Sequence, residues 1–149
     1  MPFIQSTSAI LRLFTAASAL CLPLMAQAQD APSLLLELNR SETTATPGCS
    51  LTYVATNRSE KAFSDIAYEV ATFDAEGIVS RIFALEVGAM AAGKTSILRF
   101  ELPGPTCEDY SRIVVNTVVA CTLADGSGEA DFCLSGLEIN SRAAIQFGL

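Results

Sequence analysis

The residues of this chain best suited to chemistry are four cysteines: Cys49, Cys107, Cys121 and Cys133. Four thiolates can hold a zinc ion, or they can pair as two disulfides. Zinc sites favour cysteines separated by about two to four residues, whereas the intervals here hold 57, 13 and 11 residues. The spacing therefore predicts two disulfides in an oxidising compartment, and no metal site.

Residues 88–95 match the phosphate-loop pattern G-x-x-x-x-G-K-[ST] at every position. That chemistry needs a helix after the loop, so that backbone N–H groups and the helix dipole cradle the phosphates. Here Leu98, Phe100 and Leu102 alternate with polar residues as in a strand, and Pro103 ends the run. We therefore expect a hairpin loop that binds no nucleotide cofactor.

Residues 125–131 place oxygen-bearing side chains at alternate positions, as a calcium loop does. The pattern is not completed, because Ala130 takes the place of the glycine at position 6 and Gly136 that of the bidentate acid at position 12. We expect a polar loop here, with weak calcium binding as a minor alternative.

Histidine is absent from the sequence, which removes the usual Ser-His-Asp and Cys-His sites and imidazole metal ligands. Only Lys61 and Lys94 could support a Ser-Lys arrangement, and nothing in the local sequence places a serine beside either. We therefore name no catalytic residue and expect no enzyme.

The first 28 residues have the features of a secretory signal peptide. Arg12 is their only charge, residues 13–25 are a short apolar run, and Ala-Gln-Ala at 26–28 provides a cleavage site. This organisation predicts a periplasmic or secreted protein in which residues 29–149 form a single domain.

Beyond residue 28 the chain holds 8 basic and 16 acidic residues, a net charge of −8. Such a surface repels phosphate backbones and anionic lipids, so we expect no nucleic-acid partner. No second apolar stretch is long enough to span a bilayer. A lipid anchor at Cys21 is not expected either, because Leu20 stands where processing requires a small residue.

Short alternating or β-branched segments, punctuated by Gly, Pro, Asn and Asp, predict an all-β fold. The expected strands are residues 33–39, 50–56, 65–73, 78–87, 95–102, 112–121 and 134–140. Seven such strands predict an immunoglobulin-like β-sandwich. The turn at 74–77 joins the third and fourth strands as a hairpin, and the tail at 143–149 is left open between an edge strand and a loose end.

Topology narrows the disulfide pairing. In such a sandwich the second strand lies antiparallel to the fifth, which brings Cys49 near Cys107. Cys121 ends the sixth strand and Cys133 opens the seventh, which we expect to be hairpin neighbours. We therefore predict Cys49 with Cys107 and Cys121 with Cys133, over the two other pairings.

Three segments carry a family resemblance: Tyr-Val-Ala-Thr-Asn at 53–57, Val-Ala-Thr-Phe-Asp at 70–74 followed by Gly77, and Gly93 leading into Leu-Arg-Phe at 98–100. Over residues 51–102 they resemble bacterial FxLYD-type immunoglobulin-like domains, with Phe-Asp at 73–74 in place of Tyr-Asp. The whole chain is similar to small exported proteins of alphaproteobacteria. These resemblances imply an exported β-sandwich and bring no catalytic residues.

Asn39 and Asn57 each begin an Asn-x-Ser glycosylation pattern. Because the resemblance implies a bacterial chain, we interpret both as turn-forming asparagines at strand ends.

The expected function is a non-catalytic periplasmic binding or accessory module for a protein or glycan partner. The alternative is a structural or stability role in the cell envelope, and a weak calcium-binding or enzymatic role comes third. An exposed apolar patch would favour the binding module, a polar surface the structural role, and clustered acids in a concave pocket the enzyme. The sequence predicts neither the partner nor the oligomeric state.

Overall fold

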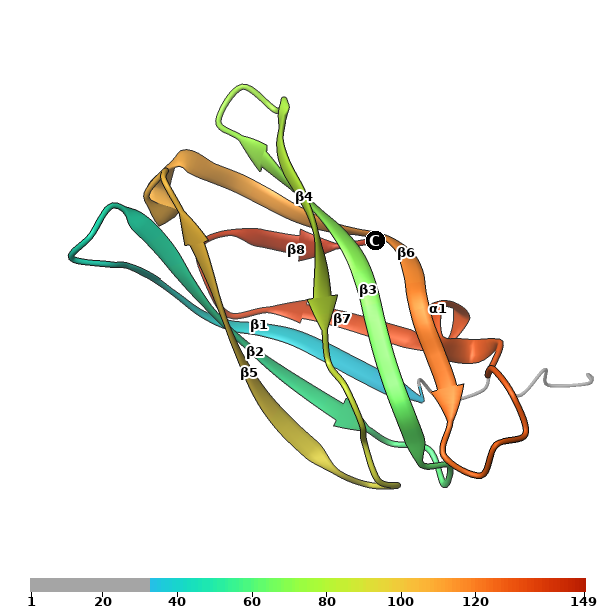
Figure 1. Ribbon diagram of the computed structural model, residues 1–149. Coiled ribbons are helices and arrows are strands. Elements are labelled where there is room, and N and C mark those ends of the chain that lie inside the picture. Colours follow the sequence, from blue (N-terminus) through green and yellow to red (C-terminus); the bar gives the residue numbers. More distant parts are fainter. Residues whose placement is uncertain (1–32) are drawn as a thin grey trace, which may run out of the picture.

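The computed structural model describes residues 33–149, which form a β-sandwich of two four-stranded sheets (Figure 1). The predicted signal peptide, residues 1–28, lies outside the described residues. Within 33–149, no helix is long and apolar enough to cross a membrane.

The first sheet has the strand order β5-β2-β1-β7 and the second has the order β4-β3-β6-β8. The strands of the first sheet are β1 (Leu34–Thr43), β2 (Gly48–Asn57), β5 (Thr95–Pro103) and β7 (Leu137–Ser141). Those of the second are β3 (Phe63–Asp74), β4 (Val79–Glu86), β6 (Tyr110–Leu123) and β8 (Gln146–Gly148). Two short helices, η1 (Cys107–Asp109) and α1 (Phe132–Ser135), connect strands.

The core lies between the sheets because each long strand turns alternate side chains inward. In β2 the side chains of Leu51, Tyr53 and Ala55 are buried, and the residues between them are half-buried. In β3, Tyr68 and Val70 are buried in the same core. Two apolar inner faces packed together explain the all-β sandwich that the sequence predicts.

The predicted hairpin of the third and fourth strands and the predicted pairing of the second strand with the fifth are confirmed. β3 and β4 pair antiparallel across a turn in which the Ile78 N–H donates to the Asp74 carboxylate at 2.8 Å and Gly77 has a φ of 79°. β2 and β5 pair antiparallel over their whole lengths. Cys49 and Cys107 are accordingly joined, with their Cα atoms 4.7 Å apart.

The last predicted strand is wrong in its start and its neighbour. Residues 134 and 135 belong to α1, and β7 pairs in parallel with β1 of the first sheet rather than with β6. The cause is a tertiary contact: the backbone N–H groups of Ser33 and Leu34 both donate to the Gly136 carbonyl, which fixes β7 beside β1.

The pairing of Cys121 with Cys133 nevertheless holds. The Ala130 N–H donates to the Cys121 carbonyl at 2.9 Å, so the chain runs back along the end of β6 before α1 begins. This return brings Cys133 to Cys121 without a hairpin.

Two further segments differ from expectation. The tail becomes the edge strand β8, which pairs in parallel with β6 and raises the number of strands to eight. Residues 88–95 do not close a hairpin, because β4 and β5 belong to different sheets and this loop crosses between them.

Candidate functional site

The first candidates for a chemical site among residues 33–149 are a metal centre and an acidic hollow. No group of three or more His, Cys, Asp or Glu side chains in this range is placed to hold a metal ion. A hollow of about 460 Å³ near η1 contains one acid, Glu108, whose carboxylate accepts a hydrogen bond from the Thr43 hydroxyl at 2.7 Å. This hydrogen bond is the main cause that lowers the pKa of Glu108.

The phosphate-loop match at 88–95 has the wrong structural context. Gly88 and Gly93 adopt positive φ values of 74° and 70°, and the Lys94 N–H donates to the Ala91 carbonyl in a tight turn. Strand β5 follows directly, so no helix N-terminus faces the loop. That the loop binds no nucleotide stays a prediction.

The acidic loop at 125–131 is shaped by its own hydrogen bonds. The Asp125 carboxylate accepts hydrogen bonds from the Ser127 hydroxyl at 2.6 Å and the Ser127 N–H at 2.9 Å, which hold its pKa below the ordinary value. Asp125 therefore has a local role as a turn cap.

The two Asn-x-Ser asparagines differ. Asn57 is fully buried, and its amide donates to the carbonyls of Lys61 at 2.7 Å and Ala91 at 3.0 Å. Its Oδ1 accepts from the Ser59 N–H and hydroxyl, forming the turn that the sequence predicts. Asn39 is exposed and donates to Glu37.

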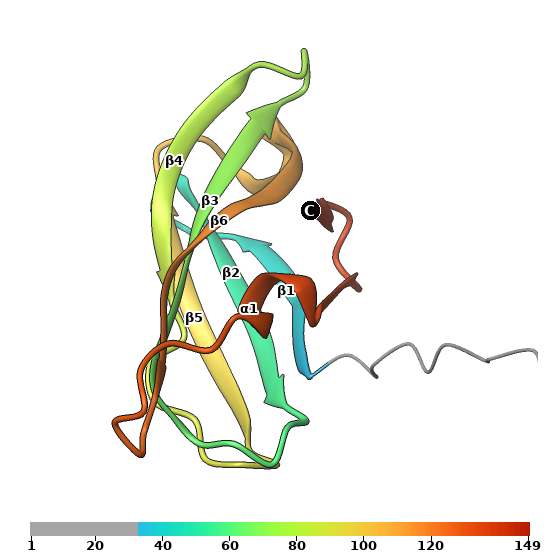
Figure 2. The ribbon, with the colours of Figure 1, turned by 90° about the vertical axis from the view of Figure 1, so that its right-hand side faces the viewer.

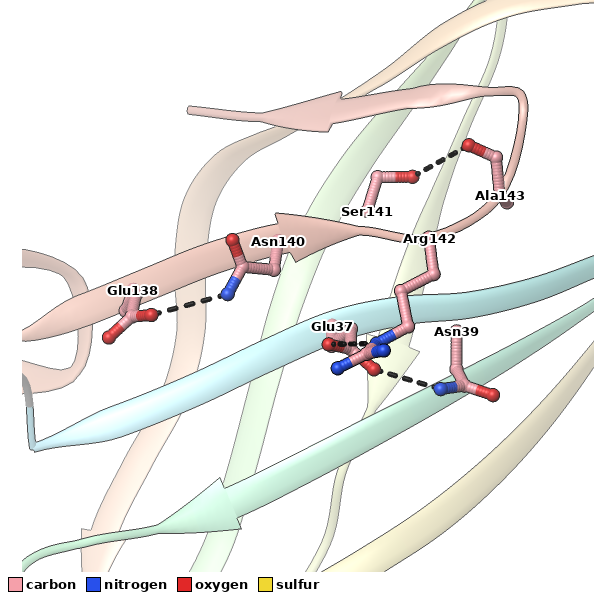
Figure 3. Close-up of polar contacts among 7 residues, drawn as sticks. All are labelled: Glu37, Asn39, Glu138, Asn140, Ser141, Arg142 and Ala143. Carbon is pink, nitrogen blue, oxygen red and sulfur yellow. Dashed lines mark hydrogen bonds and ion pairs between the residues drawn. The ribbon is translucent and has the colours of Figure 1, made fainter.

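The outer face of the first sheet carries polar contacts along β1 and β7 (Figure 3). Glu37 accepts hydrogen bonds from the Asn39 amide at 2.8 Å and from the Arg142 guanidinium at 2.9 Å, and these contacts lower the pKa of Glu37. Glu138 accepts from Asn140 at 3.2 Å and from Arg58 at 2.6 Å. These charges are matched within the chain.

The outer face of the second sheet is mainly apolar around β3, and we call it the β3 face. In β3 the core takes Tyr68, Val70 and Thr72, so the residues between them face outward. The β3 face consists of these outward residues and their paired neighbours on β4 and β6: Ala67, Glu69, Ala71, Phe73, Val79, Ile82, Ala84, Glu86, Arg112, Val114, Thr117 and Ala120. Of these residues, the alanines Ala67 and Ala71 are buried.

Strand register aligns these side chains in rows across three strands. Ala71 lies between Ile82 on β4 and Val114 on β6, and Ile82 is 58% exposed. Small alanines at the centre leave a flat apolar surface between larger neighbours. At one end of the face, the Arg112 guanidinium lies 4.0 Å from the centre of the Phe73 ring.

Two carboxylates lie on the β3 face: Glu69 on β3 and Glu86, which pairs with Ala67, on β4. Glu69 pairs with Ala84 on one side and Thr117 on the other, and its Oε1 accepts a hydrogen bond from the Asn116 amide at 2.6 Å. A half-buried acid at the centre of an apolar surface is a natural contact for a cation.

The β3 face was missed by sequence reasoning because it contains no chemical motif. The available signal was the apolar stretches 113–115 and 118–120 of β6, which are typical of strands covered on both faces.

Comparisons with family models, curated proteins and solved structures found no match for this chain.

Proposed function

We propose that this chain is a non-catalytic binding module of the periplasm that holds a protein partner on the β3 face. The observation that carries the proposal is the row formed by Ile82, Ala71 and Val114, in which the exposed Ile82 and the half-buried Val114 flank a buried alanine on the outer face of the second sheet. Exposed apolar patches on small domains mark interaction sites, because water contact there is unfavourable.

The chemistry of the face defines the partner. A flat alanine-centred surface fits another flat apolar protein surface, and Glu69 favours a lysine or arginine on the partner at the centre of the contact. The acidic net charge of the chain also favours a neutral or basic partner. Two disulfides are compatible with a location outside the cytoplasm.

A photo-crosslinking residue introduced at position 82 of the exported protein tests this proposal. We expect covalent adducts with one dominant protein from position 82. Position 39 is the control, because Asn39 is also exposed but lies on β1 of the other sheet. The same adducts from both positions, or none from position 82, would contradict the proposal.

A second variant measures affinity for the crosslinked protein. Ala71→Arg places a long cation on the flat centre of the face and should weaken binding at least about tenfold. Thr52→Arg, on the polar outer face of the first sheet, should leave the affinity unchanged. Retained unfolding midpoints in both variants ensure that the fold is intact.

A further inference from the structure

β5 is an edge strand without a β-bulge or an internal proline. It runs from Thr95 to Pro103 without a register shift against β2, and no proline precedes Pro103. Edge strands of monomers are commonly short, bulged or interrupted by proline, because free backbone groups invite pairing with another chain. Figure 2 shows β4 and β5 on the side of the molecule away from the C-terminus.

The hydrogen bonds at the ends of β5 show which backbone groups are free. The Lys94 carbonyl accepts from the Asn57 N–H at 2.8 Å, and the Gly104 N–H donates to the Pro47 carbonyl at 3.2 Å. Antiparallel bonding alternates, so even-numbered residues face β2, while the N–H and C=O groups of Ile97, Arg99 and Glu101 point to the open edge. The Pro103 carbonyl confirms this parity, because it accepts from the Arg81 guanidinium of β4 at 3.1 Å.

We infer that this edge pairs with the same edge of a second copy of the chain. The two β5 strands run antiparallel about a two-fold axis at Phe100, and the first sheet continues from one copy into the other. In this register Arg99 of each copy lies opposite Glu101 of the other, so two cross-strand ion pairs form on the outer face.

Charge selects this register over its neighbours. Centring the axis on Arg99 or on Glu101 places two like charges directly opposite each other, which is unfavourable. Centring it on Leu98 places Arg99 opposite Ile97 and forms no ion pair between opposite residues. Only the Phe100-centred register uses both charges. Its new backbone hydrogen bonds come from Arg99 and Glu101, because Pro103, opposite Ile97, has no N–H and its carbonyl already accepts from Arg81.

The side of β5 that faces the core adds an apolar contact to the dimer through Phe100. Phe100 is half-buried and stacks on Phe83 of β4, with ring centres 4.5 Å apart and an interplanar angle of 18°. Pairing brings the two Phe100 rings opposite each other and covers the edge that is open in the single copy. Such burial offsets the repulsion between two acidic molecules.

The oligomeric state of the exported protein, measured by sedimentation over a concentration series, tests this inference. We expect a dimer that weakens as salt rises, because its ion pairs are exposed. Arg99→Glu and Glu101→Arg should each weaken dimerisation at least about tenfold, while the double variant with both changes restores it to within about threefold of the wild type.

Lys94→Glu is the matched control for Arg99→Glu, since it replaces a cation with a carboxylate at an exposed position just before β5. It should leave the dimer intact. A monomeric wild type, a dimer indifferent to both reversals, or a double variant as weak as the single ones would overturn the inference. Crosslinking from position 82 does not depend on this edge, so failure of the dimer and failure of the proposed function are distinguishable.

Discussion

Asn57 connects three segments through a single buried side chain. It ends β2, holds the turn at Ser59 and Lys61, and donates to the Ala91 carbonyl in the loop that crosses between the sheets. A turn-forming asparagine is predictable from its sequence neighbours. The contact with Ala91 is not, because it joins residues 34 positions apart and depends on how the sheets pack.

We expect Asn57→Ala to lower the free energy of unfolding by about 2 kcal/mol, because two carbonyls lose a donor and the turn loses its acceptor. Asn39→Ala is the control at the other Asn-x-Ser sequence and should change stability by no more than about 0.5 kcal/mol, since its side chain is exposed. Urea unfolding at neutral pH measures both. Equal effects would mean that the hydrogen bonds of Asn57 do not stabilise the fold.

At the scale of elements, most strands follow from period-two alternation, because one sheet face is buried. The seventh strand shows where this reasoning stops. A four-residue helix such as α1 is too short to display a helical period, so nothing in the sequence separates Leu134 from the alternating pair Leu137 and Ile139 that follows it. The β3 face was equally inaccessible, because aligning Ala71 with Ile82 depends on register and β-bulges rather than on local pattern.

The two disulfides constrain loops of different lengths, with sequence separations of 58 and 12 residues. Loop-closure entropy predicts about 4 kcal/mol of stabilisation for the longer loop and about 3 kcal/mol for the shorter. We therefore expect Cys49→Ala with Cys107→Ala to lower the unfolding free energy more than Cys121→Ala with Cys133→Ala. Denaturant unfolding of the two double variants measures the order, and the reverse order would show that native contacts around α1 outweigh chain entropy.

At the scale of the whole molecule, two groups of residues make stability depend on pH, and their pKa values are shifted in opposite directions. Three carboxylates have pKa values lowered by hydrogen bonds, chiefly from Asn39, Thr43 and Ser127 respectively: Glu37, Glu108 and Asp125. Three tyrosines have pKa values raised by burial: Tyr53, Tyr68 and Tyr110. Between these groups lies a gap, because the sequence has no histidine and four of its five cysteines are in disulfides.

The signs of these shifts predict a stability plateau. A carboxylate whose pKa is lowered in the folded protein stabilises the fold at pH values above the ordinary carboxylate pKa of about 4. This stabilisation is lost as the pH falls through the lowered pKa. A raised tyrosine pKa contributes stability below about 10 and loses it as the pH rises. Unfolding free energies should therefore be flat from about pH 6 to pH 9 and fall on both sides. A step between about pH 6 and 8 would contradict this assignment, because that is where histidine titrates.

Two substitutions test whether ionisation of the buried tyrosines causes the loss of stability at alkaline pH. The Tyr53 hydroxyl is buried without a hydrogen-bond partner among residues 33–149, so Tyr53→Phe should cost nothing at pH 7 and reduce the loss of stability above about pH 10. The Tyr68 hydroxyl donates to the Cys133 carbonyl at 2.9 Å, so Tyr68→Phe should cost about 1 kcal/mol at pH 7 and reduce the alkaline loss similarly. Urea unfolding at both pH values measures each effect. An unchanged alkaline fall in both variants would show that the buried tyrosines do not cause it.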